Sequence, residues 1–174
     1  AGTLGQTPAT SGTGKYKIDA GSATTIFQGG AVSSSAGYIV EGQGTADNPM
    51  VGVLNGIFYN AATTLKPTFA NHYVQVTPAN SEDIDAFVFD NPQQQYVVAL
   101  DAALAQSGYL ETYDMNASAG STITGKSSST LDHDDTSADA ASFRLLRSAE
   151  DPENDENAAF RSVVVCINLI ELQS

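Results

Sequence analysis

The sequence predicts an all-β protein, a compact β-sandwich or β-barrel with an extended N-terminal arm. The longest apolar run, residues 161–171, is rich in β-branched residues and lacks helical spacing, which is typical of a strand covered on both faces. About nine short β-prone runs are separated by Gly, Asn and Pro, and none has the periodicity of an amphipathic helix. These observations favour packed sheets over helices.

Residues 1–14 are small and polar and include Gly and Pro, so they cannot bury a face and are expected to form a flexible or extended arm. Residues 15–174 are expected to form a single β-domain, which a chain of 174 residues can supply with a substantial core. The expected strands are, in order, 15–18, 24–27, 37–41, 51–59, 72–77, 83–90, 95–100, 108–115, 142–148 and 161–171.

Three stretches carry more detail. Gly52 and Gly56 predict a bulge or a close backbone approach within the strand at 51–59. The strand at 83–90 alternates between its two faces and is close enough to the strand at 95–100 to pair with it as a hairpin. The remaining segments are expected to be a long loop at 60–71, one helical turn at 102–106, a polar segment at 116–140 anchored by Ile123 and Leu131, and an acidic loop at 150–157.

The charge balance excludes some partners. The chain has 7 Lys+Arg against 20 Asp+Glu, a formal net charge of −13, so nothing offsets repulsion from phosphates. Binding to nucleic acid or to an anionic membrane is therefore not expected. The charge is compatible with simple solubility and with an outer surface that repels its neighbours.

The single cysteine, Cys166, lies inside the last apolar run, so no disulfide can form within the chain and a role as a small hydrophobic residue is favoured. No stretch of about 20 apolar residues could span a membrane. The N-terminus lacks the pattern of a signal peptide, and Ala1 is compatible with Met removal from a protein made in the cytoplasm.

Residues 120–127 match the phosphate-loop pattern G-x-x-x-x-G-K-S, with Lys126 and Ser127 as its last two members. A nucleotide site of this kind needs a buried strand before the loop and a helix after it. Neither flank meets that requirement, and the acidic residues that follow would repel a nucleotide. A chance match in a loop rich in Gly, Ser and Thr is favoured.

Two acidic clusters could supply oxygen ligands for calcium. One is Asp132-His133-Asp134-Asp135 with Asp139 nearby, and the other comprises Glu150, Asp151, Glu153, Asp155 and Glu156. Residues 151–162 fail the EF-hand pattern because its sixth position is Glu156 and its twelfth is Ser162. Solvated acidic turns are favoured, and binding of a cation at either cluster stays open.

No catalytic constellation stands out. His72 lies in an expected strand, His133 lies among carboxylates, and the chain has no G-x-S-x-G elbow. Asp83 and Asp85 share a strand face, but a hydrolase would also need a cleft. No catalytic, cofactor or metal residue is assigned, and the absence of Trp weakens the case for a carbohydrate-binding face.

Several segments in order resemble a family of head decoration (cement) proteins of tailed bacteriophages. They are 51–59 (VGVLNGIFY), 121–132 (STITGKSSSTLD), 145–147 (LLR), 151–155 (DPEND) and 163–168 (VVVCIN). The resemblance covers residues 15–168. Ile57 departs from it, because a cysteine is expected there.

The resemblance implies a β-rich homotrimer on the outer surface of the virion capsid at local threefold positions, with the major capsid protein as its partner. It implies no enzymatic activity and no cofactor, and it gives residues 120–127 a structural role. Residues 1–14 would clamp neighbouring capsid subunits. The alternative is a receptor- or glycan-binding β module of a virion fibre or surface protein.

Overall fold

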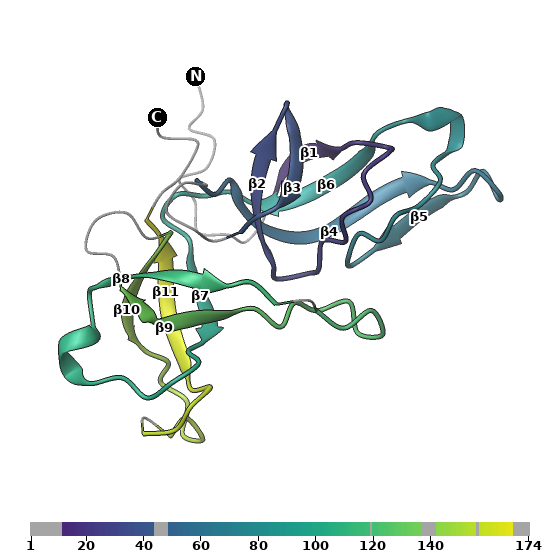
Figure 1. The fold of residues 1–174 in the computed structure, drawn as a ribbon. Helices are drawn as coiled ribbons and strands as arrows, with labels where there is room; N and C mark the ends of the chain where they lie inside the picture. The colour runs from purple at the N-terminus through teal and green to yellow at the C-terminus, as the bar shows by residue number, and fades with distance from the viewer. Residues whose placement is uncertain (1–11, 44–48, 119, 137–141, 156, 169–174) are drawn as a thin grey trace.

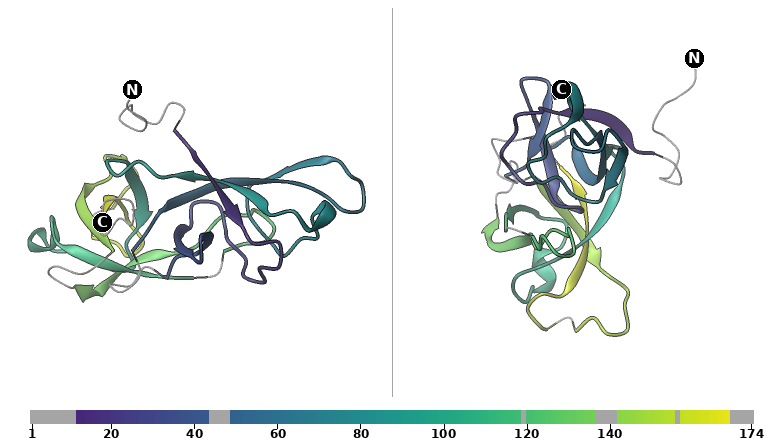
Figure 2. Two further views of the ribbon diagram at one scale, coloured as in Figure 1. Left: turned by 90° about the horizontal axis from the view of Figure 1, so that it is seen from above. Right: turned by 90° about the vertical axis from the view of Figure 1, so that its right-hand side faces the viewer.

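The computed structural model describes residues 12–43, 49–118, 120–136, 142–155 and 157–168. The all-β prediction is confirmed, because these residues form two antiparallel sheets of the kind that build a β-sandwich, with two single-turn 3₁₀ helices. Figures 1 and 2 show the two sheets following one another along the long axis of the molecule. Of the expected arm, residues 1–11 lie outside the described residues, Gly12 and Thr13 precede the first strand, and Gly14 is already part of it.

Sheet 1 has the strand order β1-β6-β4-β2-β3, and β5 pairs with the second half of β4. All of these neighbours are antiparallel. The strands are β1 (Gly14–Ile18), β2 (Ala31–Ser35), β3 (Tyr38–Glu41), β4 (Gly52–Asn60), β5 (Pro67–Ala70) and β6 (Ile84–Phe89), with the 3₁₀ helix η1 (Ala79–Ser81) before β6.

Sheet 2 has the strand order β7-β11-β10-β8-β9. Its strands are β7 (Gln95–Ala99), β8 (Thr112–Asn116), β9 (Thr130–Thr136), β10 (Phe143–Ser148) and β11 (Ser162–Ile167), with the 3₁₀ helix η2 (Gln106–Gly108) before β8. The apolar run at 161–171 therefore supplies an interior strand, as expected, although β11 ends at Ile167. A parallel bridge between Leu100 and Leu131 brings the two edges of this sheet together at one end.

Each sheet has its own hydrophobic cluster. Cluster 1 comprises Ile18, Ile26, Val32, Ile39, Val51, Leu54, Ile57, Tyr73, Ile84, Ala86 and Val88. Cluster 2 comprises Ala31, Met50, Leu100, Tyr113, Leu131, Phe143, Leu145, Val163, Val165 and Ile167. Ala31 and Met50 come from the sheet 1 part of the chain, so cluster 2 also joins the two sheets.

The expected hairpin of 83–90 with 95–100 does not form, because β6 belongs to sheet 1 and β7 to sheet 2. The buried face of β6 is the predicted one, with Ile84, Ala86 and Val88 in cluster 1. Tyr96 and Val98 of β7 pack against cluster 2 instead. The two strands therefore bury their apolar faces in different places, and the turn between them is the crossing point between the sheets.

Other expectations on strands need correction. The expected loop at 60–71 contains strand β5, and the expected polar segment at 116–140 contains strand β9. Residues 72–77 and 24–27 form only one antiparallel bridge, between Ile26 and Tyr73. The helical turn is at Gln106–Gly108 and not at 102–106. Single-residue bridges and short edge strands lack the repeated alternation on which sequence patterns depend.

The prediction about β4 is confirmed. Its register with β6 shifts between Leu54 and Gly56, which marks a bulge. A Cβ atom on Gly52 would collide with the carbonyl oxygen of Phe89, so this glycine permits the close approach of β4 and β6.

Candidate interaction surfaces

Residues 120–127 form the turn between β8 and β9, and this turn docks onto sheet 1. The Gln28 N–H donates to the Gly125 carbonyl at 2.8 Å, and the Ser127 N–H donates to the Gln28 carbonyl at 2.9 Å. The side chain of Asn71 donates to the Thr124 carbonyl at 2.8 Å. The turn therefore ties the β8–β9 hairpin of sheet 2 to the other sheet.

The turn lacks the geometry of a phosphate loop. A strand, β9, follows it, where a nucleotide site needs a helix. Its amides are also occupied: Ser121 N–H donates to the Lys126 carbonyl at 3.0 Å, and Gly125 N–H donates to the Ser121 carbonyl at 2.6 Å. Amides that bond within the turn cannot also cradle a phosphate. The geometry fits a structural connection.

The first acidic cluster lies on a strand and not in a turn. Asp132, His133 and Asp134 belong to β9. The carboxylate of Asp101 accepts the His133 N–H at 2.9 Å, and the His133 ring contacts Asp134 at 3.2 Å. Asp139 lies outside the described residues. Strand alternation puts Asp132 and Asp134 on one face, where the Asp134 backbone N–H donates to the Asp132 carboxylate at 3.0 Å, and His133 on the other.

The second acidic cluster is a loop, as expected, and Asn154 holds it in place. The Asn154 side-chain amide donates to the Ser148 hydroxyl and to the carbonyls of Ala149 and Ser162, at 2.9 to 3.1 Å. Its side-chain oxygen accepts the Ser162 N–H at 2.8 Å. Glu156 lies outside the described residues. Within the described part of the chain, no three His, Cys, Asp or Glu side chains gather in a group that could hold a metal ion.

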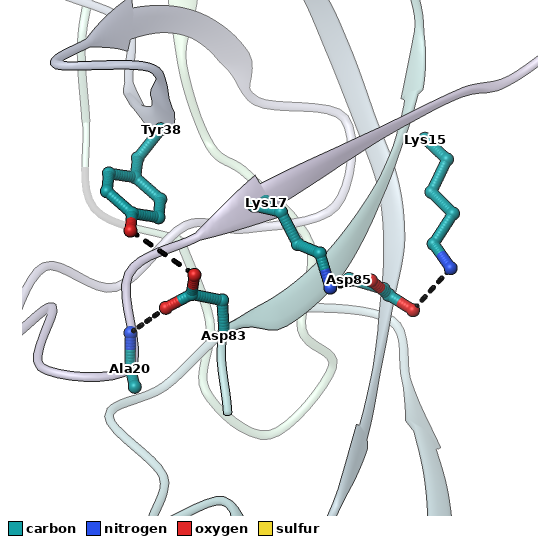
Figure 3. A network of polar contacts seen from close by, with 6 residues as sticks. All are labelled: Lys15, Lys17, Ala20, Tyr38, Asp83 and Asp85. Atoms are coloured by element: carbon teal, nitrogen blue, oxygen red, sulfur yellow. Dashed lines mark hydrogen bonds and ion pairs between the residues drawn. The ribbon is translucent and has the colours of Figure 1, made fainter. Parts of the chain in front are cut away.

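Asp83 and Asp85 have separate structural roles (Figure 3). Asp85 on β6 contacts the ammonium groups of Lys15 at 2.7 Å and Lys17 at 2.6 Å, both from β1. Burial raises the pKa of Asp85, but the hydrogen bonds and charges of the two lysines outweigh it, so the pKa lies below its usual value. Asp83 accepts hydrogen bonds from the Tyr38 hydroxyl at 3.2 Å and the Ala20 N–H at 3.4 Å.

The two histidines and the cysteine also have structural surroundings. His72 stacks on Phe27 with ring centroids 5.9 Å apart, and its Nδ1 lies 2.9 Å from Asn71 Oδ1. It is not part of a strand, contrary to expectation. Cys166 on β11 is half-buried, and burial raises the pKa of its thiol, which disfavours the reactive thiolate.

A cavity of about 160 Å³ lies where the sheets meet. Its lining is mostly apolar and includes Ala31, Val53, Met115, Leu131, Phe143 and Val165. The Tyr96 hydroxyl, from another lining residue, donates to the Phe89 carbonyl at 2.9 Å. Because convergent polar groups usually fix a ligand or a reacting atom, this apolar space resembles an imperfectly filled core more than an active site.

The outer face of sheet 1 carries aromatic side chains beside the ion pairs of Asp85. In the strand register, Lys17 lies opposite Asp85, Asp85 opposite Phe58, and Phe58 opposite Phe69. The rings of Phe58 and Phe69 are 4.7 Å apart, and Phe69 is 74% exposed. Phe69 therefore offers an aromatic surface on the edge strand β5.

One end of the molecule combines exposed apolar residues with lysines. The β4–β5 hairpin contributes Leu65 and Phe69, which are 73% and 74% exposed, and the exposed Lys66. The β8–β9 turn contributes Ile123, which is 95% exposed, and the exposed Lys126. The bond between Asn71 and Thr124 joins the turn to the end of β5 that is remote from Leu65 and Lys66. We name these five residues the tip patch.

The other end combines exposed apolar residues with carboxylates. Leu110 and Phe160 are 63% and 68% exposed. Each adjoins one partner of a side-chain contact, in which Arg161 donates to the Tyr109 hydroxyl at 3.0 Å and lies over the Tyr109 ring. Glu111 adjoins Leu110, and Glu150 and Glu153 lie on the acidic loop; all three are exposed. We name Leu110, Glu111, Glu150, Glu153 and Phe160 the base patch.

The sequence did not point to either patch. Isolated apolar residues in turns have no periodicity, so they cannot be told from buried anchors, and Ile123 was expected to be such an anchor. Comparisons of the chain with family models, curated proteins and solved structures found no match. No helix among the described residues has the length and apolar character needed to cross a membrane.

Proposed function

We propose that this chain is a structural virion protein that binds the outer surface of a tailed-phage capsid as a homotrimeric decoration protein and stabilises the shell. The observation that carries the proposal is the pair of exposed apolar patches, tip and base, on an acidic all-β frame. Exposed apolar groups of this kind are suited to contacts with other proteins. The major capsid protein is the proposed partner.

The charge supports an exterior position. A chain with net charge −13 would be repelled by packaged DNA, whereas on the outer shell the same charge keeps particles apart. The side chains of Asp83, Asp85 and Asn154 are engaged in hydrogen bonds or ion pairs within the chain, which supports a structural role over catalysis.

Residues 1–14 are proposed to contact a neighbouring capsid subunit, with the part before Gly12 outside the described residues. A polar segment that becomes ordered on a shell gains contact area there. Deleting residues 1–12 leaves β1 intact and should reduce occupancy on capsids. Full occupancy of that deletion variant would overturn this role of the arm.

The test of the function is a cryo-EM map of particles from the source of this gene, together with co-sedimentation of the purified chain with capsids that lack it. Density for the chain in trimers over threefold positions is expected. A Phe69→Ser, Ile123→Ser variant, which removes two exposed side chains of the tip patch without touching either hydrophobic cluster, should bind capsids less than the wild type. A shell without this density, or density only on a tail or spike, would contradict the proposal.

A receptor- or glycan-binding module is the second candidate, and the aromatic pair of Phe58 and Phe69 on the outer face of sheet 1 favours it. Aromatic rings can stack on sugar faces. Soluble glycan binding that is lost in Phe69→Ser, without capsid binding, would support this candidate over the first.

A further inference from the structure

We propose that the apolar cavity where the sheets meet, together with a surface hollow at its entrance, binds a small monocarboxylate whose apolar body enters the cavity. The proposal does not rest on capsid binding. Three observations carry it: the size and apolar lining of the cavity, its continuity with a hollow that contains a lysine, and the lack of carboxylates in the lining of both.

The cavity has the size and lining of a site for a small apolar group. Its volume is about 160 Å³, and its apolar lining from both sheets includes Ala31, Val53, Met115 and Leu131. An apolar cavity of about 150 Å³ engineered in another protein stays dry and takes up benzene. Because a cavity in an apolar core lowers stability, a group that fills it should bind and stabilise the fold.

The cavity reaches the surface between the two edge strands of sheet 2. Its lining includes Val97 and Val98 from β7, and Ser129, which directly precedes β9. The bridge between Leu100 and Leu131 joins these two edges next to this point. Val97 is 67% exposed and lines both the cavity and a hollow on the surface. The gap between β7 and β9 is therefore the entrance.

The hollow at this entrance is continuous with the cavity, because the two share Gly29, Val97, Val98 and Ser129. Gly29 faces open space: apart from its chain neighbours, no residue has an atom within 4 Å of a Cβ built there. The other residues of the hollow are Gln28, Ala99, Lys126, Ser127 and Ser128. The cavity itself has few polar groups, but its entrance supplies several.

The hollow is cationic in a strongly acidic chain. Lys126 is exposed, and it takes part in none of the ion pairs among the described residues. The chain has 20 Asp+Glu, yet none of those in the described segments lines the cavity or the hollow. An anionic group at the entrance can therefore pair with Lys126 and accept a hydrogen bond from the Ser128 hydroxyl.

These features together select the class of ligand. An apolar interior with one lysine at its mouth suits an apolar body that ends in a single negative charge. The net charge of −13 disfavours ligands with several negative charges, such as nucleotides. A short fatty acid or an arylalkanoic acid has the required form.

The test measures binding of octanoate to the full chain by isothermal titration calorimetry, below the concentration at which octanoate forms micelles. The matched probes 1-octanol and octylammonium have the same apolar body and a neutral or positive head group. Octanoate should bind most tightly and octylammonium most weakly, because the head group meets Lys126. In NMR spectra, octanoate should shift the methyl signals of Met115 and Val165, which line the cavity.

One variant tests the head-group contact. Lys126→Glu should weaken octanoate binding about fivefold or more and leave 1-octanol binding unchanged within about twofold. Lys66→Glu is the matched control, because Lys66 is also exposed, its replacement changes the net charge equally, and it lines neither the cavity nor the hollow. This control should bind both probes like the wild type.

Two variants test the apolar part of the site by filling it. Ala31→Leu should weaken binding of octanoate and 1-octanol about tenfold or more, because the larger side chain occupies part of the cavity. Val53→Leu adds less volume at a half-buried lining position and should weaken both about threefold. Each variant is first checked for wild-type circular dichroism, and Val53→Leu decides the result if Ala31→Leu does not fold.

Octanoate that does not bind, or that binds the filled variants as tightly as the wild type, would overturn the proposal. Equal affinity for the three probes, or octanoate binding that ignores Lys126→Glu, would overturn the choice of a carboxylate. Capsid binding is measured separately, so either result leaves the decoration function to its own test.

Discussion

Asn154 shows how one side chain can fix a loop that sequence patterns describe only as acidic and polar. Its amide bonds to Ser148, Ala149 and Ser162, which lie on β10, just after it and on β11. We predict that Asn154→Ala lowers the free energy of unfolding by about 2 kcal/mol, because these half-buried groups lose their partner.

Urea unfolding followed by circular dichroism measures this effect, and Asn157→Ala is the control. The Asn157 side chain is exposed, and its backbone N–H donates to the Asp155 carboxylate at 2.9 Å. The control should change stability by less than about 0.5 kcal/mol. Equal losses in the two variants would contradict the anchoring role of Asn154.

Asp85 makes stability depend on pH. Its pKa is lowered in the folded state, so its contribution is complete above the unfolded pKa of about 4 and is lost as pH falls through the folded value. The hydrogen bond to Asp85 raises the pKa of Lys17, more than its slight burial lowers it. That contribution is complete below about pH 10 and is lost as pH rises through the folded pKa.

We therefore predict that Asp85→Asn costs on the order of 1 kcal/mol near neutral pH and progressively less at both extremes. The measurement is the difference in unfolding free energy between wild type and variant at pH 3, 7 and 11. A difference that stays constant across this range would show that the ion pairs do not act on stability.

Variants of the β8–β9 turn can distinguish a structural turn from a nucleotide site. Gly125 has φ of 72°, and a Cβ atom there would collide with the side chain of Asn71. Gly125→Ala should lower the free energy of unfolding by about 2 kcal/mol, whereas Lys126→Ala should change it by less than about 0.5 kcal/mol. Thermal melts of both variants, with and without ATP and magnesium, measure this. Stabilisation of the wild type by nucleotide, lost in Lys126→Ala, would contradict the structural assignment.

Elements with strong alternation or continuous apolar character could be predicted from the sequence. The buried face of β6 and the interior position of β11 are examples. Strand β9 could not be predicted, because its acidic residues resemble a solvated turn and its pairing with β8 depends on distant residues. The prediction that β6 pairs with β7 was wrong for the same reason. Strand pairing is decided by tertiary packing, which adjacency in the sequence does not reveal.

At the scale of the whole molecule, we predict a single unfolding transition. Ala31 and Met50 pack in cluster 2, and the β8–β9 turn bonds to sheet 1, so neither sheet can unfold without exposing the other. Differential scanning calorimetry should give equal calorimetric and van't Hoff enthalpies. Two separate transitions would instead divide residues 15–174 into two units.

The interior position of β11 has a consequence for synthesis on the ribosome. Sheet 1 is complete once Phe89 has emerged, whereas β7 and β10 must wait for residues 162–167 before they gain their shared neighbour. A nascent chain therefore holds all the strands of sheet 1 but an unfinished second sheet, with apolar strands exposed meanwhile. Pairing across so many residues is slow, which makes this interval the stage at which the chain is most prone to aggregation and most dependent on chaperones.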